Sequence, residues 1–501
     1  MLVCSKWHRI QRFREDRSVR ERPTTVAVVG SGTMGAGVAQ VAAAAGHQVL
    51  LHDARAGTAE QAIAGVASAL ARRVAQGKLP AAEREAQLGR LSAVATLQDL
   101  AGAGLVVEAV VEELAVKQRL FVDLEAVVAA DAILATNTSS LSVTAIGAAL
   151  RDPARLVGMH FFNPVPAMAL VEVVSGAATA PDLADAVSAI AASWGKTPVQ
   201  AKSTPGFIVN RVARPFYAEA LRVLGEGGGD VATLDAVMRE SGGFRMGPFE
   251  LMDLIGHDVN FAVTRSVWQA FFHDPRFTPS LVQQELVEAG FLGRKTGRGF
   301  YRYSDAERPA PATLPLGPAP RLVGDPLAEL SAGCRIEIDG RTALARTDGR
   351  TATARMDAED GLPLVLVDLA LDYGKATRVA LAAADQAAPD DLARAAGLFQ
   401  ALGKDVSRLD DVPGILVMRT VAMLANEAAD AVHQGVASAD AVDTAMRLGT
   451  GYPRGPLAWA NSIGLSTVTT VLDNLVSAYG EDRYRTSPLL RRRLLAGGNL
   501  I

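Results

Sequence analysis

Residues 26–53 read VAVVGSGTMGAGVAQVAAAAGHQVLLHD, and this stretch decides the fold. The β-branched run at 26–29 is typical of a buried strand, the Ala-rich stretch after it is typical of a helix, and the run at 49–52 is typical of a second strand. Between the first strand and the helix, three glycines have the spacing G-x-G-x-x-G. This order predicts the first β-α-β unit of an α/β, doubly wound, Rossmann-like domain that binds a dinucleotide.

Each glycine of this turn has its own physical role. Gly30 permits the tight turn from strand to helix, Gly32 lets the backbone approach a pyrophosphate, and Gly35 lets the helix pack closely on the strand. The first helical residues, Thr33 and Met34, lie where N–H groups and the positive end of the helix dipole face the phosphates. All five are predicted cofactor-binding residues.

An acid directly after the second strand indicates which cofactor binds. The carboxylate of Asp53 is placed to accept hydrogen bonds from the ribose hydroxyls, and it would repel a 2′-phosphate. The sequence therefore predicts NAD rather than NADP.

Composition is that of an ordinary soluble globular protein. The chain has 501 residues, 49% hydrophobic and 21% charged, which is too long for a single core and predicts about two to four domains. Its two cysteines, Cys4 and Cys334, form no C-x-x-C pair. We therefore expect no disulfide framework and a reducing, cytoplasmic location.

Several classes of partner are not expected. A net charge of -4 gives no reason to predict nucleic acid, and no apolar run approaches the roughly 18 residues of a membrane span. No H-E-x-x-H motif or Cys/His cluster indicates a metal site. The Arg-rich residues 1–23 lack the apolar core of a secretory signal, so we expect a disordered extension; an organelle-targeting or nucleic-acid-binding arm is the alternative.

Three further apolar runs, at residues 105–110, 133–136 and 156–162, alternate with helical sequence and predict more strands of the same sheet. Ligands of such sheets bind at the carboxyl ends of the strands. The polar cluster 137–140 follows one of these runs, and His160 lies near the end of the next. Both are therefore candidates for the site.

The apolar run at 170–174 is interrupted by Glu172, and a buried carboxylate is unfavourable unless it has a partner. The prolines of the segment 163–166, NPVP, predict a turn that folds this run back on His160. A carboxylate bonded to one imidazole nitrogen fixes the tautomer and raises the basicity of the other nitrogen. We predict a general base and its orienting acid; a structural histidine is the alternative.

Taken together, these motifs resemble the L-3-hydroxyacyl-CoA dehydrogenase family, over nearly all of the chain from Thr24. The resemblance rests on the segments GSGTMGAGVAQ, VVEAVVEE, TNTSSL, HFFNPVP, LVEVV and TPGFIVNR. It implies a Rossmann-like NAD-binding domain followed by all-α C-terminal domains. It also implies an acyl-CoA substrate, NAD as cofactor, and oxidation of an L-3-hydroxyacyl-CoA to the 3-oxoacyl-CoA in fatty-acid or phenylacetate breakdown.

The resemblance also implies roles for individual residues. His160 corresponds to the catalytic base and acid, and Glu172 to the acid that orients it. Ser139 and Asn210 correspond to polar residues that contact the substrate. Beyond the glycine turn and Asp53, the implied cofactor contacts are Glu112, Lys117, Asn163 and Lys295.

Two groups of basic residues are candidates for contacts with the rest of the substrate. Arg72, Arg73 and Lys78 cluster near the turn of a predicted helical hairpin over residues 58–91, where they would form a rim for a phosphorylated carrier; a solvated helix face is the alternative. A 3-hydroxyadipyl chain, unlike a short monocarboxylic one, would need a cation for its second carboxylate. The candidates for that cation are Arg211, Arg214 and Arg245; a surface or ion-pairing role is the alternative for each.

An internal repeat covers the C-terminal part of the chain. Residues recur without gaps at one constant spacing, for example Arg211 as Arg419 and Glu219 as Glu427. Asn210, however, recurs as Met418, which has no hydrogen-bond donor. We therefore expect the second copy to be structural and to replace a dimer partner, giving a monomer with an internal pseudo-dimer or a homo-oligomer.

The region between the copies contains turn and strand signals. Asp339-Gly340 and Asp348-Gly349 are interpreted as hairpin turns, and residues 363–369 as a strand. The predicted domains are a disordered extension (1–23), the NAD-binding domain (24–203), a first helical domain (204–303), a linker (304–330), a partial repeat of the sheet (331–410) and a second helical domain (411–501).

Two other functions remain open on the sequence alone. One is an NAD-dependent dehydrogenase of a free hydroxy acid. The other is an inactive NAD-binding partner in an acyl-CoA enzyme assembly, although the presence of His160, Glu172, Ser139 and Asn210 together argues against it.

Overall fold

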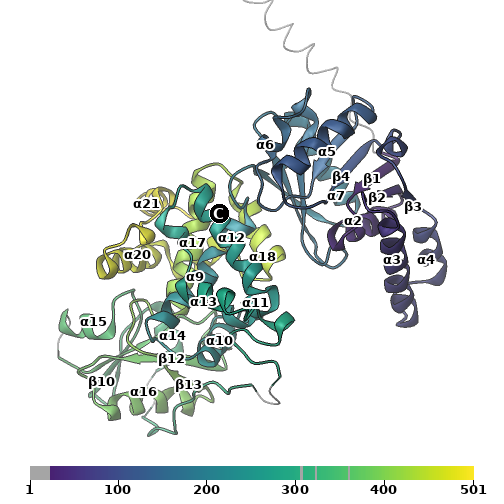
Figure 1. Cartoon of the computed structure of the whole chain (residues 1–501). Helices are drawn as coiled ribbons and strands as arrows, with labels where there is room; N and C mark the ends of the chain where they lie inside the picture. Colours follow the sequence, from purple (N-terminus) through teal and green to yellow (C-terminus); the bar gives the residue numbers. More distant parts are fainter. Residues whose placement is uncertain (1–22, 305–307, 322–323, 359–360) are drawn as a thin grey trace, which may run out of the picture. The chain divides into compact units, whose positions relative to one another are not determined.

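A computed structural model describes residues 23–304, 308–321, 324–358 and 361–501 (Figure 1). The chain divides into two compact units, Met1–Ser203 and Thr204–Ile501, and each is described by itself. The predicted disordered extension lies outside the described residues except for Pro23. That residue is buried, and its carbonyl oxygen lies 2.7 Å from Nδ1 of His47, so it belongs to the first unit and not to an extension.

The first unit is built on an eight-stranded sheet. Its first six strands along the sheet are parallel, β7 is antiparallel to β6, and β8 is parallel to β7. The order is β3 (Leu91–Val94), β2 (Gln48–His52), β1 (Thr25–Val29), β4 (Leu105–Glu108), β5 (Ile133–Thr136), β6 (Leu156–Phe161), β7 (Leu170–Ser175) and β8 (Thr197–Lys202). The sheet reverses its strand order between β1 and β4, which confirms the predicted doubly wound fold.

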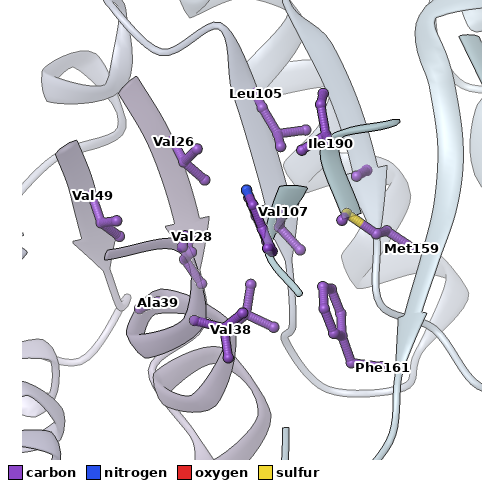
Figure 2. Close-up of a cluster of buried hydrophobic side chains, with 14 of the residues drawn as sticks. Val26, Val28, Val38, Ala39, Val49, Leu105, Val107, Met159, Phe161 and Ile190 are labelled. Atoms are coloured by element: carbon purple, nitrogen blue, oxygen red, sulfur yellow. The ribbon is translucent and has the colours of Figure 1, made fainter. Parts of the chain in front are cut away.

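Helices cover both faces of this sheet: α2 (Thr33–Ala44), α3 (Thr58–Ala75), α4 (Ala81–Leu88), α5 (Leu114–Val127), α6 (Val143–Gly147) and α7 (Pro181–Ser193). Figure 2 shows part of the core, where Val38 and Ala39 of α2 pack against Val28 of β1 and Phe161 of β6. The predicted helical hairpin is present as α3 and α4, but it is shorter than expected because Leu91 begins β3.

The second unit contains two sets of helices in the same order. The first set is α8 (Val209–Val212), α9 (Arg214–Gly225), α10 (Val231–Glu240), α11 (Pro248–Ile255), α12 (His257–Ala270) and α13 (Leu281–Glu288). The second set is α17 (Val417–His433), α18 (Ala439–Thr450), α19 (Pro456–Ile463), α20 (Leu465–Tyr479) and α21 (Pro488–Leu495). Asp235 accepts hydrogen bonds from the first N–H groups of α11, and Asp443 does the same at α19. The internal duplication is therefore visible in the structure as well as in the sequence.

Along the sequence, a five-stranded sheet comes between the two sets of helices. Its strand order is β13 (Asp405–Arg408), β12 (Arg378–Ala383), β11 (Leu364–Val367), β10 (Thr342–Arg346) and β9 (Ile336–Ile338). Its helices are α14 (Pro326–Ala332), α15 (Ala352–Ala358) and α16 (Pro389–Ala401). The hairpin predicted at Asp339-Gly340 is correct, since β9 and β10 are antiparallel.

Two interpretations of this middle region are wrong. Asp348-Gly349 does not form a hairpin, because β10 and β11 are parallel and α15 connects them. The Asp411 carboxylate accepts hydrogen bonds from the first N–H groups of α15 and so stabilises the start of that helix. The predicted linker over 304–330 is also too long, since α14 begins at Pro326.

Reciprocal ion pairs join the two sets of helices. Arg211 of the first copy binds Glu427 of the second at 2.5 Å, and the equivalent Arg419 binds Glu219 at 2.8 Å. All four side chains are almost completely buried. Each copy thus donates to the other in the same way, as the two partners of a symmetric dimer do.

Candidate active site

The His160–Glu172 pair is the centre of the candidate site. The two residues lie directly opposite each other on the antiparallel strands β6 and β7, so their side chains leave the same face of the sheet. Nδ1 of His160 is 2.6 Å from Oε2 of Glu172, and only 6% and 0% of the two residues is exposed. Since a carboxylate can only accept, this contact places the ring proton on Nδ1 and the lone pair on Nε2.

The polar loop after β5 is tied both to β6, at the residue next to His160, and to the segment that follows β4. Oδ1 of Asn137 accepts a hydrogen bond of 2.9 Å from the backbone N–H of Phe161, the residue next to His160. Glu112 accepts hydrogen bonds from the backbone N–H groups of Ser139 and Ser140, at 2.9 and 3.0 Å. The loop that carries Ser139 is therefore held in place at two points, one of them next to His160.

Behind this loop lies a buried network of charges that the sequence analysis did not anticipate. Nζ of Lys117, which is 1% exposed, is 2.5 Å from Glu108 and 3.3 Å from Glu112. Glu108 also accepts a hydrogen bond from the Thr136 hydroxyl at 2.7 Å. Burial opposes ionisation of Glu112, but hydrogen bonds from the Thr138 hydroxyl and the loop, with the charge of Lys117, lower its pKa.

This network changes how Glu112 and Lys117 are interpreted. Both were predicted as cofactor contacts, but in this structure the described partners of the Lys117 ammonium are protein oxygens. They support the loop that carries Ser139, and their contact with NAD stays a prediction. The signal available in the sequence was Glu108, a second acid in an apolar strand.

The glycine turn has the shape that a dinucleotide requires. Gly30 has a φ of +97°, and a Cβ there would lie 2.5 Å from the carbonyl oxygen of Ala109; a Cβ on Gly35 would lie 1.7 Å from the carbonyl oxygen of Gly30. A Cβ on Gly32 would meet nothing within 4 Å. Two glycines therefore allow close packing, and the third leaves open space at the N-terminus of α2, beside Thr33 and Met34, where a pyrophosphate fits.

Asp53 is held rigidly at the carboxyl end of β2. Its Oδ2 accepts hydrogen bonds from the backbone N–H and the hydroxyl of Ser31, at 2.9 and 2.8 Å, and its Oδ1 accepts one from the N–H of Arg55. Burial would raise the pKa of Asp53, but these bonds outweigh it and lower the pKa. The site thus presents a fixed negative charge next to the glycine turn, and its residues fit NAD.

The other predicted residues are more widely spread. Asn163 is exposed in the turn between β6 and β7. Arg72, Arg73 and Lys78 are exposed at the end of α3 and after it, and none has an ion pair within the described part of the chain. Asn210 and Lys295 belong to the second unit, where Lys295 pairs with Asp258 at 2.5 Å. Their contacts with substrate or cofactor stay predictions.

Comparison with known families identifies the two units. Residues 25–204 match the model described as "3-hydroxyacyl-CoA dehydrogenase, NAD binding domain", and residues 206–303 and 414–499 each match that family's C-terminal domain. The chain belongs to the 3-hydroxyacyl-CoA dehydrogenase family. Residues 344–413 match the "3-hydroxybutyryl-CoA dehydrogenase reduced Rossmann-fold domain", which agrees with the small sheet between the helical sets. The family is NAD-dependent, so the cofactor predicted from the glycine turn is confirmed.

Individual relatives are similar over most of the chain. A 3-hydroxyadipyl-CoA dehydrogenase of Escherichia coli is 49% identical over 94% of this chain and 97% of its own length. A 3-hydroxybutyryl-CoA dehydrogenase of Bradyrhizobium diazoefficiens is 40% identical over 57% of this chain and 97% of its own. The crystal structure of a 3-hydroxybutyryl-CoA dehydrogenase of Escherichia coli has a TM-score of 0.91 and 48% identity, covering 95% of this chain and 99% of that one.

The described residues contain neither a helix that could span a membrane nor a cluster of metal ligands. No helix within the described ranges is both long enough and apolar enough to cross a membrane. In the same part of the chain, no three His, Cys, Asp or Glu side chains come together as metal ligands would.

Proposed function

We propose that this chain oxidises L-3-hydroxyacyl-CoA esters to 3-oxoacyl-CoA esters, with His160 as the general base. The observation that carries the proposal is the buried contact of 2.6 Å between His160 and Glu172 at the carboxyl edge of an NAD-binding sheet. Membership of the 3-hydroxyacyl-CoA dehydrogenase family supports the same reaction.

In the proposed reaction the substrate loses a proton and a hydride. Nε2 of His160 accepts the proton of the C3 hydroxyl, and the Glu172 carboxylate stabilises the imidazolium that forms. NAD, when bound, supplies the acceptor for the hydride that leaves C3. Proton and hydride together account for the two hydrogens lost when an alcohol becomes a ketone.

Two polar residues would stabilise the oxygen of the substrate. Ser139 is placed to donate to this oxygen as it becomes a carbonyl, because Glu112 fixes the backbone of its loop. Asn210 would donate a second hydrogen bond. Exposed Arg72, Arg73 and Lys78 would contribute positive charge for the phosphates of coenzyme A.

The finer features of the function are also proposals. We propose a short-chain or adipyl-type substrate, a role in fatty-acid or phenylacetate breakdown, and a cytoplasmic location. The reciprocal ion pairs favour a monomer with an internal pseudo-dimer, although another face could still form a homo-oligomer.

One assay distinguishes this proposal from the alternatives. Formation of NADH or NADPH is measured with L-3-hydroxybutyryl-CoA, and with free L-3-hydroxybutyrate. We expect turnover of the CoA ester with NAD. Turnover of only the free acid would support a hydroxy-acid dehydrogenase, and NADH binding without turnover of either would support an inactive partner.

A further inference from the structure

Among the described residues of the second unit, every buried arginine except Arg214 forms an ion pair with an acid. Arg211 and Arg276 both bind Glu427, and Arg419 and Arg483 both bind Glu219. Arg214 is 5% exposed, and no carboxylate within the described residues pairs with it. Burial lowers the pKa of its guanidinium, and Tyr217 and Tyr452 oppose this shift only in part.

The contacts of Arg214 are all with neutral groups. Its Nε donates to the carbonyl oxygen of Asn210 at 2.7 Å, and Nη1 donates to the Thr264 hydroxyl at 3.1 Å. The guanidinium carbon lies 5.0 Å from the centre of the Tyr217 ring. A buried cation without a counterion is unfavourable, and it becomes favourable when an anion binds beside it.

The duplication shows that this cluster is not needed to build the helical fold. At the equivalent positions of the second copy, Asn210 is replaced by Met418 and Arg214 by Ala422. Tyr217 is replaced by Ala425 and Thr264 by Leu472, so that every polar member of the cluster becomes apolar. The ion-paired residues Arg211 and Glu219, in contrast, are retained as Arg419 and Glu427. The second copy keeps the residues that join the copies and lacks those around Arg214.

A cavity of about 420 Å³ begins at this cluster and follows one face of α9. Arg214, Tyr217 and Thr264 line it, and Leu221 and Val282 supply apolar surface. The acids in its lining, Glu226 and Glu481, lie at the other end, where both pair with Arg222. Among the described residues that line this cavity, Arg214 is therefore the cation without a carboxylate partner. An anion that entered the cavity would pair with it.

The spacing between Asn210 and Arg214 is similar to the distance between C3 and the terminal carboxylate of a 3-hydroxyadipyl chain. The two residues are one helical turn apart, or about 6 Å along the axis, and the bond to the Asn210 carbonyl shows that the guanidinium points back toward Asn210. In a 3-hydroxyadipyl chain the terminal carboxylate is three carbon–carbon bonds from C3, or about 4 Å when extended. If C3 of the substrate lies near Asn210, its second carboxylate thus lies near Arg214.

We infer that Arg214 binds the terminal carboxylate of a dicarboxylic 3-hydroxyacyl-CoA and selects that substrate over monocarboxylic ones. The inference rests on the proposed function, because it places C3 beside Asn210. Thr264 orients the guanidinium, and the two methylene groups C4 and C5 of the substrate lie between Asn210 and Arg214. Of the three arginines considered from the sequence, Arg211 is occupied by Glu427, and Arg245 is exposed.

The test compares two substrates of equal chain length. L-3-Hydroxyadipyl-CoA and L-3-hydroxyhexanoyl-CoA differ only in the terminal group, so the ratio of their kcat/KM values measures recognition of the carboxylate. In Arg214→Leu we expect kcat/KM for the adipyl ester to fall about 10- to 150-fold, as for loss of a charge-assisted hydrogen bond, while the hexanoyl value is retained or rises. Arg214→Lys should recover part of the preference.

Arg265→Leu is the matched control, since it removes the same charge from an exposed position next to Thr264 and should leave the ratio unchanged. An equal loss for both substrates in Arg214→Leu, or an unchanged ratio, would overturn the inference. A wild-type preference for the hexanoyl ester would overturn it as well. If the wild-type chain turned over neither ester, the proposed function itself would fail, and the inference with it.

Discussion

Replacing Glu219 with glutamine tests whether the reciprocal ion pairs hold the two helical copies together. Glu219 is fully buried and accepts hydrogen bonds from Arg419 at 2.8 Å, from Arg483 at 2.8 Å and from the Tyr484 hydroxyl at 3.0 Å. The variant keeps the shape of the side chain and removes its charge. Arg483 then loses its carboxylate partner, and of the described carboxylates Arg419 keeps only Glu226.

Two arguments give a similar loss of folding stability for Glu219→Gln. Breaking a buried ion pair by removing one partner typically costs about 3–5 kcal/mol. Burial alone would raise the pKa of Glu219, but the charges of Arg483 and Arg419 lower it from 4.5 to about 2. A pKa difference of this size corresponds to about 3 kcal/mol of stability at neutral pH. The apparent melting temperature should fall on the order of 10 °C.

The pH dependence gives the sharper test. Because the pKa of Glu219 is lower in the folded state, its stabilising contribution is complete above the unfolded value of 4.5 and is lost as the pH falls toward about 2. The difference in unfolding free energy between wild type and Glu219→Gln should therefore be constant from pH 7 to pH 5 and shrink below that. Urea unfolding measured at each pH gives this difference.

Asp473→Asn provides the control, since Asp473 pairs with Arg491 on the surface and should contribute less than about 1 kcal/mol. If Glu219→Gln cost no more than this control, or if its effect did not change between pH 5 and pH 3, the ion pairs would not be what joins the copies.

Three further predictions concern the cofactor and the second copy. Asp53→Ala should weaken NAD binding much more than it changes NADP binding, measured by titration, since one cofactor loses a hydrogen-bond acceptor and the other loses a repulsion; equal effects would contradict this. Met418→Asn should leave kcat within about twofold while lowering stability, because a buried amide replaces an apolar side chain. Truncation after Tyr303 should give aggregates or dimers in size-exclusion chromatography, because it uncovers the face of α9 that packs on α17; a stable monomer would contradict the pseudo-dimer.

The contact between His160 and Glu172 could be predicted because its signals are local. A carboxylate in an apolar strand requires a partner, and the NPVP turn placed Glu172 opposite His160. The glycine turn and Asp53 were predictable for the same reason, since strand, turn, helix and acid follow one another without interruption. The repeat was equally visible, because it needs only the sequence compared with itself.

Other features depend on contacts between distant segments. The edge strands β3 and β8 were missed because they are short and partly exposed, without a continuous apolar run. The turn at Asp348-Gly349 has the composition of a hairpin, and only the pairing of β10 with β11 shows that a helix intervenes. The ion pairs of Lys117 with Glu108 and Glu112 could not be predicted, because the sequence alone does not show that both acids lie within reach of its ammonium group.

The most direct test of the proposed mechanism is the rate of NADH formation by His160→Gln at saturating NAD and L-3-hydroxyacyl-CoA, measured together with NADH affinity. Glutamine can still bond to Glu172 but cannot accept the hydroxyl proton. We predict that kcat falls by roughly 10²- to 10⁴-fold while NADH binds as tightly as in the wild type. A variant with unchanged kcat would remove His160 from the mechanism and contradict the account.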